Sequence, residues 1–168
     1  EFCDELLGID LDRLESVSGV PREEVREAAI AYAAYFRATG KEHYREKAAE
    51  TFDRFREYNQ TPGLIPPKFT EHRKMRSMGV PMIGIVTAQE LRSNLQDDSY
   101  TAYINEWIRE IERYFMNHEY RAVMETVGSK GEFLDHFDGR TLNPGHAIEG
   151  AWFILREALY REEDPDLT

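Results

Sequence analysis

The chain has 168 residues and a formal net charge of −11, because 32 aspartates and glutamates outnumber 21 lysines and arginines. Hydrophobic residues make up 41% of it and charged residues 32%, which is ordinary for one globular domain and too apolar for a disordered chain. A surface this acidic repels nucleic-acid phosphates and anionic lipid, so we expect neither nucleic acid nor membrane as a partner.

Cysteine content and hydropathy exclude further kinds of site and of protein. Cys3 is the single cysteine, which excludes an intrachain disulfide and a cysteine-based zinc site. No run approaches the ~18 consecutive apolar residues of a membrane-spanning helix, and the acidic first residues do not resemble a signal peptide. We therefore expect a cytoplasmic protein. The chain begins without methionine, which suggests a fragment or a processed product.

Two helices are predicted in the first part of the chain, over residues 21–39 and 41–58. Both repeat apolar side chains at the i, i+3, i+4, i+7 spacing of a buried helix face. These apolar positions are Val25, Ala28, Ala29, Tyr32, Tyr35, Phe36, Tyr44, Ala48, Phe52 and Phe55. A turn as short as the one at Gly40 makes the two helices antiparallel neighbours. Residues 1–20 hold leucines that would suit a short helix.

A long loop is predicted for residues 59–79. Its helix-breaking residues are Pro62, Gly63, Pro66 and Pro67. Structureless loops of this length are often functional lids or binding loops. The basic run at its end supplies three candidate anion-binding residues, with a plain surface loop as the alternative interpretation. They are Arg73, Lys74 and Arg76.

A second helical hairpin and a final helix are predicted after this loop. Residues 80–95 begin almost wholly apolar, as in an inner packed helix, and residues 99–117 carry one apolar stripe that would pack against it. β-Branched and aromatic residues bounded by glycines predict a short β-hairpin or extended excursion near 120–137. A turn at 138–140 leads to a last helix from Pro144 to about Glu162. We expect one all-α domain over residues 1–168, built from antiparallel helical hairpins.

The candidate chemistry lies at the start of the last helix. Asn143 suits the N-cap position and Pro144 the first helical position. His146 then falls in the first turn beside free backbone N–H groups, where a neutral ring that can accept a proton is favoured. Glu149 lies three residues on and could orient the imidazole or contact a substrate hydroxyl. Its negative charge would favour the protonated ring and so oppose the effect of the helix dipole.

Plainer interpretations stand beside this one. A histidine near a helix start is more often structural than catalytic. The His-x-x-Glu spacing resembles half of a zinc site, but no third ligand follows on a known spacing, so we expect no metal. Trp152 and Phe153 either wall a pocket or fill the core, and core packing is the commoner outcome. Glu125 is equally well explained as a solvated charge.

Residues 139–153 resemble the signature of the N-acylglucosamine 2-epimerase family. The similar positions are Gly139-Arg140, Asn143-Pro144-Gly145-His146, Glu149 and Trp152-Phe153. Weaker stretches agree in order with the family: Arg37-Ala38-Thr39-Gly40, Val80-Pro81-Met82, and Val123-Met124-Glu125-Thr126-Val127 about twenty residues before the signature. The resemblance covers most of residues 25–160.

This resemblance implies an (α/α)6 barrel, of which the chain would form a central part without the family's N- and C-terminal helices. It implies a carbohydrate 2-epimerase that interconverts N-acyl-D-glucosamine and N-acyl-D-mannosamine through the proton at C2 of the open-chain sugar. His146 matches one of the family's two histidines, and Glu125 and Glu149 match its glutamates, so these three are the candidate catalytic residues. No cofactor is required, although ATP activates some members.

Position alone makes Arg140, Asn143 and Trp152 the candidate substrate-binding residues, the first two as donors to the charge that grows on O1. Members of the family are more than twice as long as this chain. None of the remaining histidines falls in the family's second histidine motif; these are His43, His72, His118 and His136. We therefore expect the middle section of an epimerase, with the second base unassigned.

Two other functions are weighed against this one. A glycoside hydrolase on the same helical barrel needs paired carboxylates, for which Glu125 and Glu149 are the candidates. A non-catalytic, truncated helical interaction protein would expose apolar faces of inner helices and bind a partner through them. Such faces also make a homodimer possible.

Overall fold

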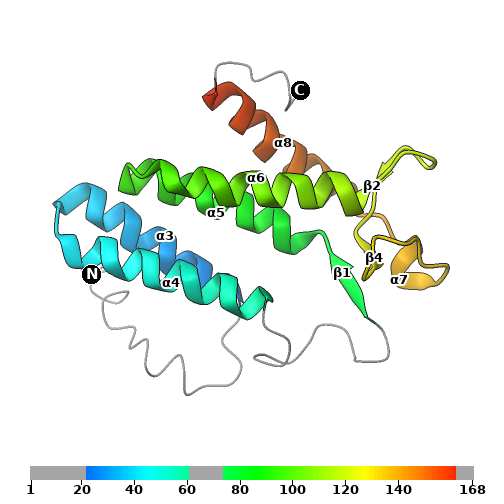
Figure 1. The fold of residues 1–168 in the computed structure, drawn as a ribbon, viewed down its shortest axis with the longest axis horizontal. Coiled ribbons are helices and arrows are strands. Elements are labelled where there is room, and N and C mark those ends of the chain that lie inside the picture. The colour runs from blue at the N-terminus through cyan, green and yellow to red at the C-terminus, as the bar shows by residue number, and fades with distance from the viewer. Residues whose placement is uncertain (1–21, 61–73, 162–168) are drawn as a thin grey trace. The chain divides into compact units, whose positions relative to one another are not determined.

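The computed structural model describes residues 22–60 and 74–161 as mainly helical, with four short strands in those ranges (Figure 1). The described residues fall into two compact units, one of 22–60 with 90–97 and one of 74–89 with 98–161. The mostly helical class is confirmed, whereas the (α/α)6 ring and the single-domain organisation stay predictions. None of the helices in these ranges is long and apolar enough to cross a bilayer.

The first unit is the predicted helical hairpin. Helix α3 (Arg22–Thr39) and helix α4 (Glu42–Gln60) pack together along their apolar stripes, and Figure 1 shows the tight turn that joins them. Gly40 makes this turn possible because its φ of +67° lies in the left-handed region. Its amide donates to the Phe36 carbonyl at 2.7 Å and closes α3. The expectation of a short helix in residues 1–20 falls outside the described residues.

The second unit starts with strand β1 (Met75–Ser77) and helix α5 (Gly79–Leu95), whose end from residue 90 belongs to the first unit. The elements that follow are η1 (Asp98–Tyr100), α6 (Thr101–Glu110), the π-helix η2 (Ile111–Phe115), β2 (Met116–Asn117), β3 (Ala122–Val123), β4 (Thr126–Gly128), α7 (Phe137–Arg140) and α8 (Pro144–Tyr160). Strand β1 pairs antiparallel with β4, and β2 pairs antiparallel with β3.

Two predicted boundaries are wrong, both because strand pairing replaces the structure expected from the local pattern. The loop expected over 59–79 contains β1, since Arg76 pairs with Val127 of β4, about fifty residues along the chain; residues 61–73 of that loop lie outside the described ranges. The helix expected to reach residue 117 widens into η2 and stops at Phe115, because Met116 and Asn117 start the β2–β3 hairpin. That hairpin confirms the predicted β excursion, and the turn predicted at 138–140 is the short helix α7.

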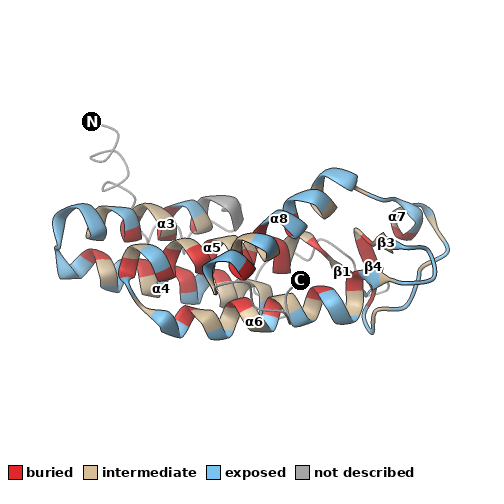
Figure 2. Cartoon of the chain, turned by 90° about the horizontal axis from the view of Figure 1, so that it is seen from above, coloured by how far each residue is buried: buried red, intermediate tan, exposed pale blue. Residues whose placement is uncertain are grey.

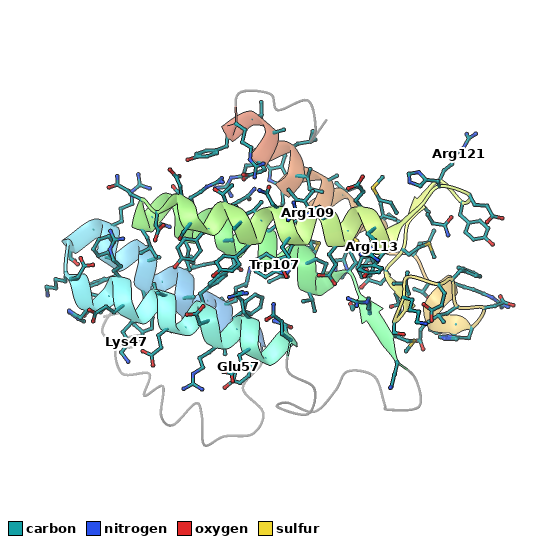
Figure 3. The ribbon with its side chains drawn as sticks, in the orientation of Figure 1. Lys47, Glu57, Trp107, Arg109, Arg113 and Arg121 are labelled. Carbon is teal, nitrogen blue, oxygen red and sulfur yellow. The ribbon has the colours of Figure 1, made fainter. Side chains whose placement is uncertain are left out.

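Close contact between α5 and α6 sets the core of the second unit. Gly84 faces the indole of Trp107, which is 6% exposed, and a Cβ on Gly84 would lie 2.5 Å from Trp107 Cδ2. Figure 3 labels Trp107 on α6. The missing side chain at Gly84 therefore lets the ring lie flush against α5. The largest fully buried side chains in this unit include Ile85, Ile104, Phe115 and Val127.

We expect Gly84→Ala to destabilise the chain by about 1–3 kcal/mol, because the added methyl group overlaps a buried ring that has no room to move. Urea unfolding followed by circular dichroism measures this change. The control is Gly79→Ala in the same helix, where the new Cβ would lie 3.7 Å from Ser77 Oγ, an ordinary contact. Equal unfolding free energies for the two variants would contradict the packing described.

Candidate functional site

The first turn of α8 is built by Asn143 and Pro144. Asn143 has extended backbone, and its side-chain oxygen accepts a hydrogen bond from the His146 amide at 3.2 Å. Pro144 occupies the first helical position, where a backbone N–H would have no acceptor within the helix, so a proline without that N–H is well tolerated. The predicted N-cap is thus confirmed, and the cap acts on the backbone of the candidate base itself. His146 is placed in the first turn of α8 by this short local motif.

Glu125 reaches the same place from the link between β3 and β4. The Met124 amide donates to the Phe115 carbonyl at 2.8 Å, and the Glu125 carbonyl accepts from the Met78 amide at 3.0 Å. Met124 is 4% exposed, and Thr126 on the other side is buried as well. The backbone of Glu125 is therefore held on both sides.

His146 and Glu125 meet although 21 residues separate them. His146 Nδ1 lies 2.9 Å from Glu125 Oε2, with side-chain exposures of 40% and 16% respectively. A carboxylate oxygen accepts hydrogen bonds, so this contact fits the tautomer in which Nδ1 carries the ring hydrogen and donates a hydrogen bond to Oε2. The second ring nitrogen, Nε2, then keeps its lone pair and is the atom that can accept a proton.

This pair divides the predicted catalytic residues. Two of the three, His146 and Glu125, are in direct contact, whereas Glu149 is exposed on α8. The orienting role considered for Glu149 falls to Glu125. Spacing along α8 could not reveal this, because Glu125 comes from another element.

Helix α8 is fixed to the first part of α5 by groups that share one face. Gly150 lies against Met78, where a Cβ would be 2.7 Å from Met78 Cε. Gln89 Nε2 donates to the Phe153 carbonyl at 2.9 Å and to Glu157 Oε2 at 3.1 Å. Sequence analysis missed this contact, although Gly150, Phe153 and Glu157 recur at the i, i+3, i+7 spacing of one helix face.

Glu157 is the buried charge of this contact. Its side chain is fully buried, and Oε1 accepts a hydrogen bond from Arg161 Nε at 2.8 Å. Arg161 also donates to Asn105 on α6 at 2.8 Å. The carboxylate is therefore neutralised and hydrogen-bonded, as a buried charge must be.

The candidate substrate-binding residues lie apart from one another. Arg140 pairs with Asp135, with 2.7 Å from Nε to Oδ1, and Asn143 uses its side-chain oxygen in the cap. Trp152 is 58% exposed, whereas its neighbour Phe153 is 8% exposed and belongs to the core. The predicted core packing is confirmed for Phe153 and is wrong for Trp152. The binding roles of Arg140, Asn143 and Trp152 stay predictions.

The basic run is only partly described. Arg73 lies outside the described residues, and Lys74 is exposed. Arg76 donates to the Ser129 carbonyl at 2.8 Å and to Glu110 Oε1 at 3.0 Å, and its guanidinium stands 4.4 Å from the centre of the Tyr114 ring. Arg76 thus joins β1 to its neighbours, which leaves its anion-binding role a prediction. Burial raises the pKa of Glu110, an effect that the Arg76 charge opposes.

A hollow of about 250 Å³ in the second unit is lined by residues of η2, the β2–β3 hairpin and β4 with its following loop. His146 and Glu149 are not among its lining residues. Within the ranges that the structure describes, no group of three or more histidine, cysteine, aspartate and glutamate side chains could hold a metal ion.

Several curated proteins are similar to this chain in sequence. No protein-family model matches the chain. The N-acylglucosamine 2-epimerase of Bos taurus is 30% identical over 129 residues, which is 75% of this chain and 31% of the bovine protein. The enzymes of the same name from Rattus norvegicus and Homo sapiens are 29% and 30% identical, over 79% of this chain and 32% and 31% of their own lengths.

The chain is similar to N-acylglucosamine 2-epimerases. The predicted resemblance to the family of these enzymes is confirmed by the relatives. The chain spans about a third of the length of the curated N-acylglucosamine 2-epimerases it matches.

We expect Asn143→Ala to lower the free energy of unfolding by about 0.5–2 kcal/mol, because the His146 amide loses its acceptor. Asn143→Ser should retain most of the stability, since a serine hydroxyl caps a helix equally well. Thermal or urea unfolding of both variants measures the difference. A loss of equal size in the two variants would show that Asn143 contributes something other than a cap.

We expect Glu110 to make stability fall as the pH rises above its ordinary pKa of 4.5. The folded chain binds the Glu110 proton more tightly than the unfolded chain, so the stabilising contribution is full at low pH and is lost as the pH rises through the raised pKa. Urea unfolding between about pH 4 and pH 6 should therefore give a more positive slope for Glu110→Gln than for the wild type. Parallel curves would contradict the assignment.

Proposed function

We propose that this chain supplies one of the two acid–base groups of a sugar 2-epimerase, with His146 as that group. The observation that carries the proposal is the hydrogen bond from His146 Nδ1 to Glu125. It supports a defined tautomer in which Nε2 can take up a proton. Both residues lie in the stretches that resemble the epimerase family.

The proposed chemistry needs a base because the hydrogen at C2 is acidic only in the open-chain aldehyde. The C2–H bond breaks, its proton goes to His146 Nε2, and its electron pair forms a C1–C2 double bond. The π electrons of the C1 carbonyl move to O1, which gives an enolate that keeps its N-acyl group on C2. Return of a proton to the opposite face restores the aldehyde with inverted C2. A positioned base contributes about 10²–10⁴-fold to such a step.

Glu125 would act on this step through His146. As Nε2 gains a proton the ring becomes an imidazolium, and the carboxylate at Nδ1 stabilises that new positive charge. The low exposure of Glu125, at 16%, strengthens the interaction because little water screens it. Glu125 is thus proposed as a positioning residue and His146 as the catalytic residue.

The proposed substrate is an N-acyl-D-glucosamine and N-acyl-D-mannosamine pair, in line with the printed names of the relatives. Glu149 as a sugar-binding group and ATP as an activator stay predictions. A glycoside hydrolase would use two opposed carboxylates, but Glu125 is paired with an imidazole. The observed partner therefore favours proton transfer.

Exchange of the C2 hydrogen with solvent tests His146 without requiring epimerisation. A base on one face can remove the C2 proton of N-acetylmannosamine and return deuterium from D2O to that face, which proton NMR detects. We expect the 168-residue chain to show such exchange with little or no conversion to N-acetylglucosamine. His146→Gln should reduce exchange by about 10²–10⁴-fold.

Matched variants separate the roles of the two residues. Glu125→Gln keeps an oxygen that can accept from Nδ1 but removes the charge, so we expect a smaller loss of about 10–100-fold. His118→Gln removes an exposed histidine of the β2–β3 hairpin and should leave exchange unchanged. Exchange that survives in His146→Gln would overturn the proposal.

A further inference from the structure

The hollow beside the end of η2 is a feature of the second unit that the proposed epimerase chemistry does not use. Its volume is about 250 Å³, and none of its lining residues belongs to α8, the helix that carries His146. Figure 2 shows the β2–β3 hairpin and the loop after β4 largely in the pale blue of exposed residues. Both segments line the hollow, so a ligand can reach it from solvent.

Arg113 is the only permanently charged residue in the lining of this hollow. It is exposed and lies in η2, and Figure 3 labels it near the end of the helical run. Among the residues that the structure describes, no carboxylate pairs with its guanidinium, which lies 5.1 Å from the centre of the Tyr114 ring. The guanidinium of Arg76 also lies near this ring, but Glu110 neutralises it. In a chain of net charge −11, an uncompensated guanidinium beside a hollow favours an anionic ligand.

Asn117 supplies a second hydrogen-bond donor to the hollow. Its Oδ1 accepts from the Tyr120 amide at 3.0 Å, which stabilises the turn between β2 and β3. Its Nδ2 makes no hydrogen bond within the described part of the chain, so that nitrogen can donate to a ligand oxygen. A guanidinium and an amide that both donate, in a lining without any carboxylate, match the acceptor oxygens of a ligand carboxylate.

Most of the other lining residues are apolar. Met124 and Val127 are buried, whereas Phe133 is exposed. The centre of the Phe133 ring lies 5.2 Å from that of Tyr120, so aromatic surface borders the hollow. An inorganic anion would leave this apolar surface in water, whereas an aromatic ring would cover it. Pockets for drug-sized ligands measure ~300–1,000 Å³, so a hollow of about 250 Å³ suits a smaller ligand, of about ten non-hydrogen atoms.

The backbone around the hollow also departs from regular structure. The Met116 amide donates to the Ile111 carbonyl, five residues back, which makes η2 a π-helix. Such widened turns are rare and are frequent at functional sites, and this one carries Arg113 and Tyr114. On the facing loop Gly131 has a φ of +87°, and a Cβ there would lie 2.9 Å from Tyr114 Cδ1, so a residue without a side chain is required beside the ring.

We propose that this hollow binds a small carboxylate that carries an apolar ring. The carboxylate accepts hydrogen bonds from Arg113 and from Asn117 Nδ2, and the ring lies against Phe133 and the buried apolar residues of the lining. Neither His146 nor Glu125 lines the hollow. The proposed ligand is therefore additional to the sugar of the epimerase reaction, and the two proposals are tested independently.

Benzoate is the probe, because it is an aryl carboxylate of the expected size. Titration of the full chain with benzoate up to about 10 mM, followed through the backbone amide signals in two-dimensional NMR spectra, measures binding. We expect a Kd of about 1 mM or lower, with the largest signal shifts at the lining residues. Benzamide has the same ring without the charge and should bind at least about 10-fold more weakly.

Variants that alter one charge test the two donors. Arg113→Gln should weaken benzoate binding by at least about 10-fold, because the guanidinium is lost. The control is Arg109→Gln, which removes another exposed guanidinium one turn earlier on α6, outside the lining, and should leave binding unchanged. Asn117→Asp keeps an oxygen that can accept from the Tyr120 amide but places a negative charge in the lining, so it should also weaken binding by at least about 10-fold.

Circular dichroism confirms that each variant stays folded. The proposal would be overturned by an absence of signal shifts at about 10 mM benzoate, by equal binding of benzamide, or by displacement of benzoate by an equal concentration of inorganic phosphate. Binding that either Arg113→Gln or Asn117→Asp leaves unchanged would overturn it as well, and so would an equal loss in Arg109→Gln.

Discussion

The candidate site depends on how α8 is held against the first part of α5. A helix that carries a base in its first turn delivers that base correctly only if the helix can neither rotate nor slide. Gly150 sets the distance of closest approach, because no side chain separates α8 from Met78. The Gln89 amide then fixes the position along the helix by bonding to both Phe153 and Glu157.

Met78 links the two segments that carry His146 and Glu125. Its amide donates to the Glu125 carbonyl at 3.0 Å, and its side chain lies beneath Gly150, one turn after His146. One buried residue between β1 and α5 is thus in contact with the segments that carry the base and its carboxylate. Met78 therefore contacts both of the segments whose side chains meet at 2.9 Å across 21 residues.

Sequence patterns predicted the features that depend on residues close together in the chain. Apolar periodicity located the long helices, and the Asn143-Pro144 pair located the start of α8 and its cap. The sequence could not reveal strand β1, since its residues become a strand only by pairing with β4. For the same reason, the sequence did not predict the partner of His146. Glu149 lies nearby on the same helix, but the residue that contacts the ring is Glu125, which lies between strands β3 and β4.

The packing of α8 against α5 buries the charged side chain of Glu157, which costs desolvation free energy. An ion pair with Arg161 is a weak source of stability, because desolvation of both groups offsets their attraction. The buried pair does, however, strongly favour one register of α8 against α5. A one-residue shift of α8 turns the helix by about 100° and moves Glu157 away from Gln89, leaving part of a buried charge without its hydrogen bond. The same turn would carry His146 away from Glu125, so the penalty for misplacing Glu157 also protects the geometry of the base.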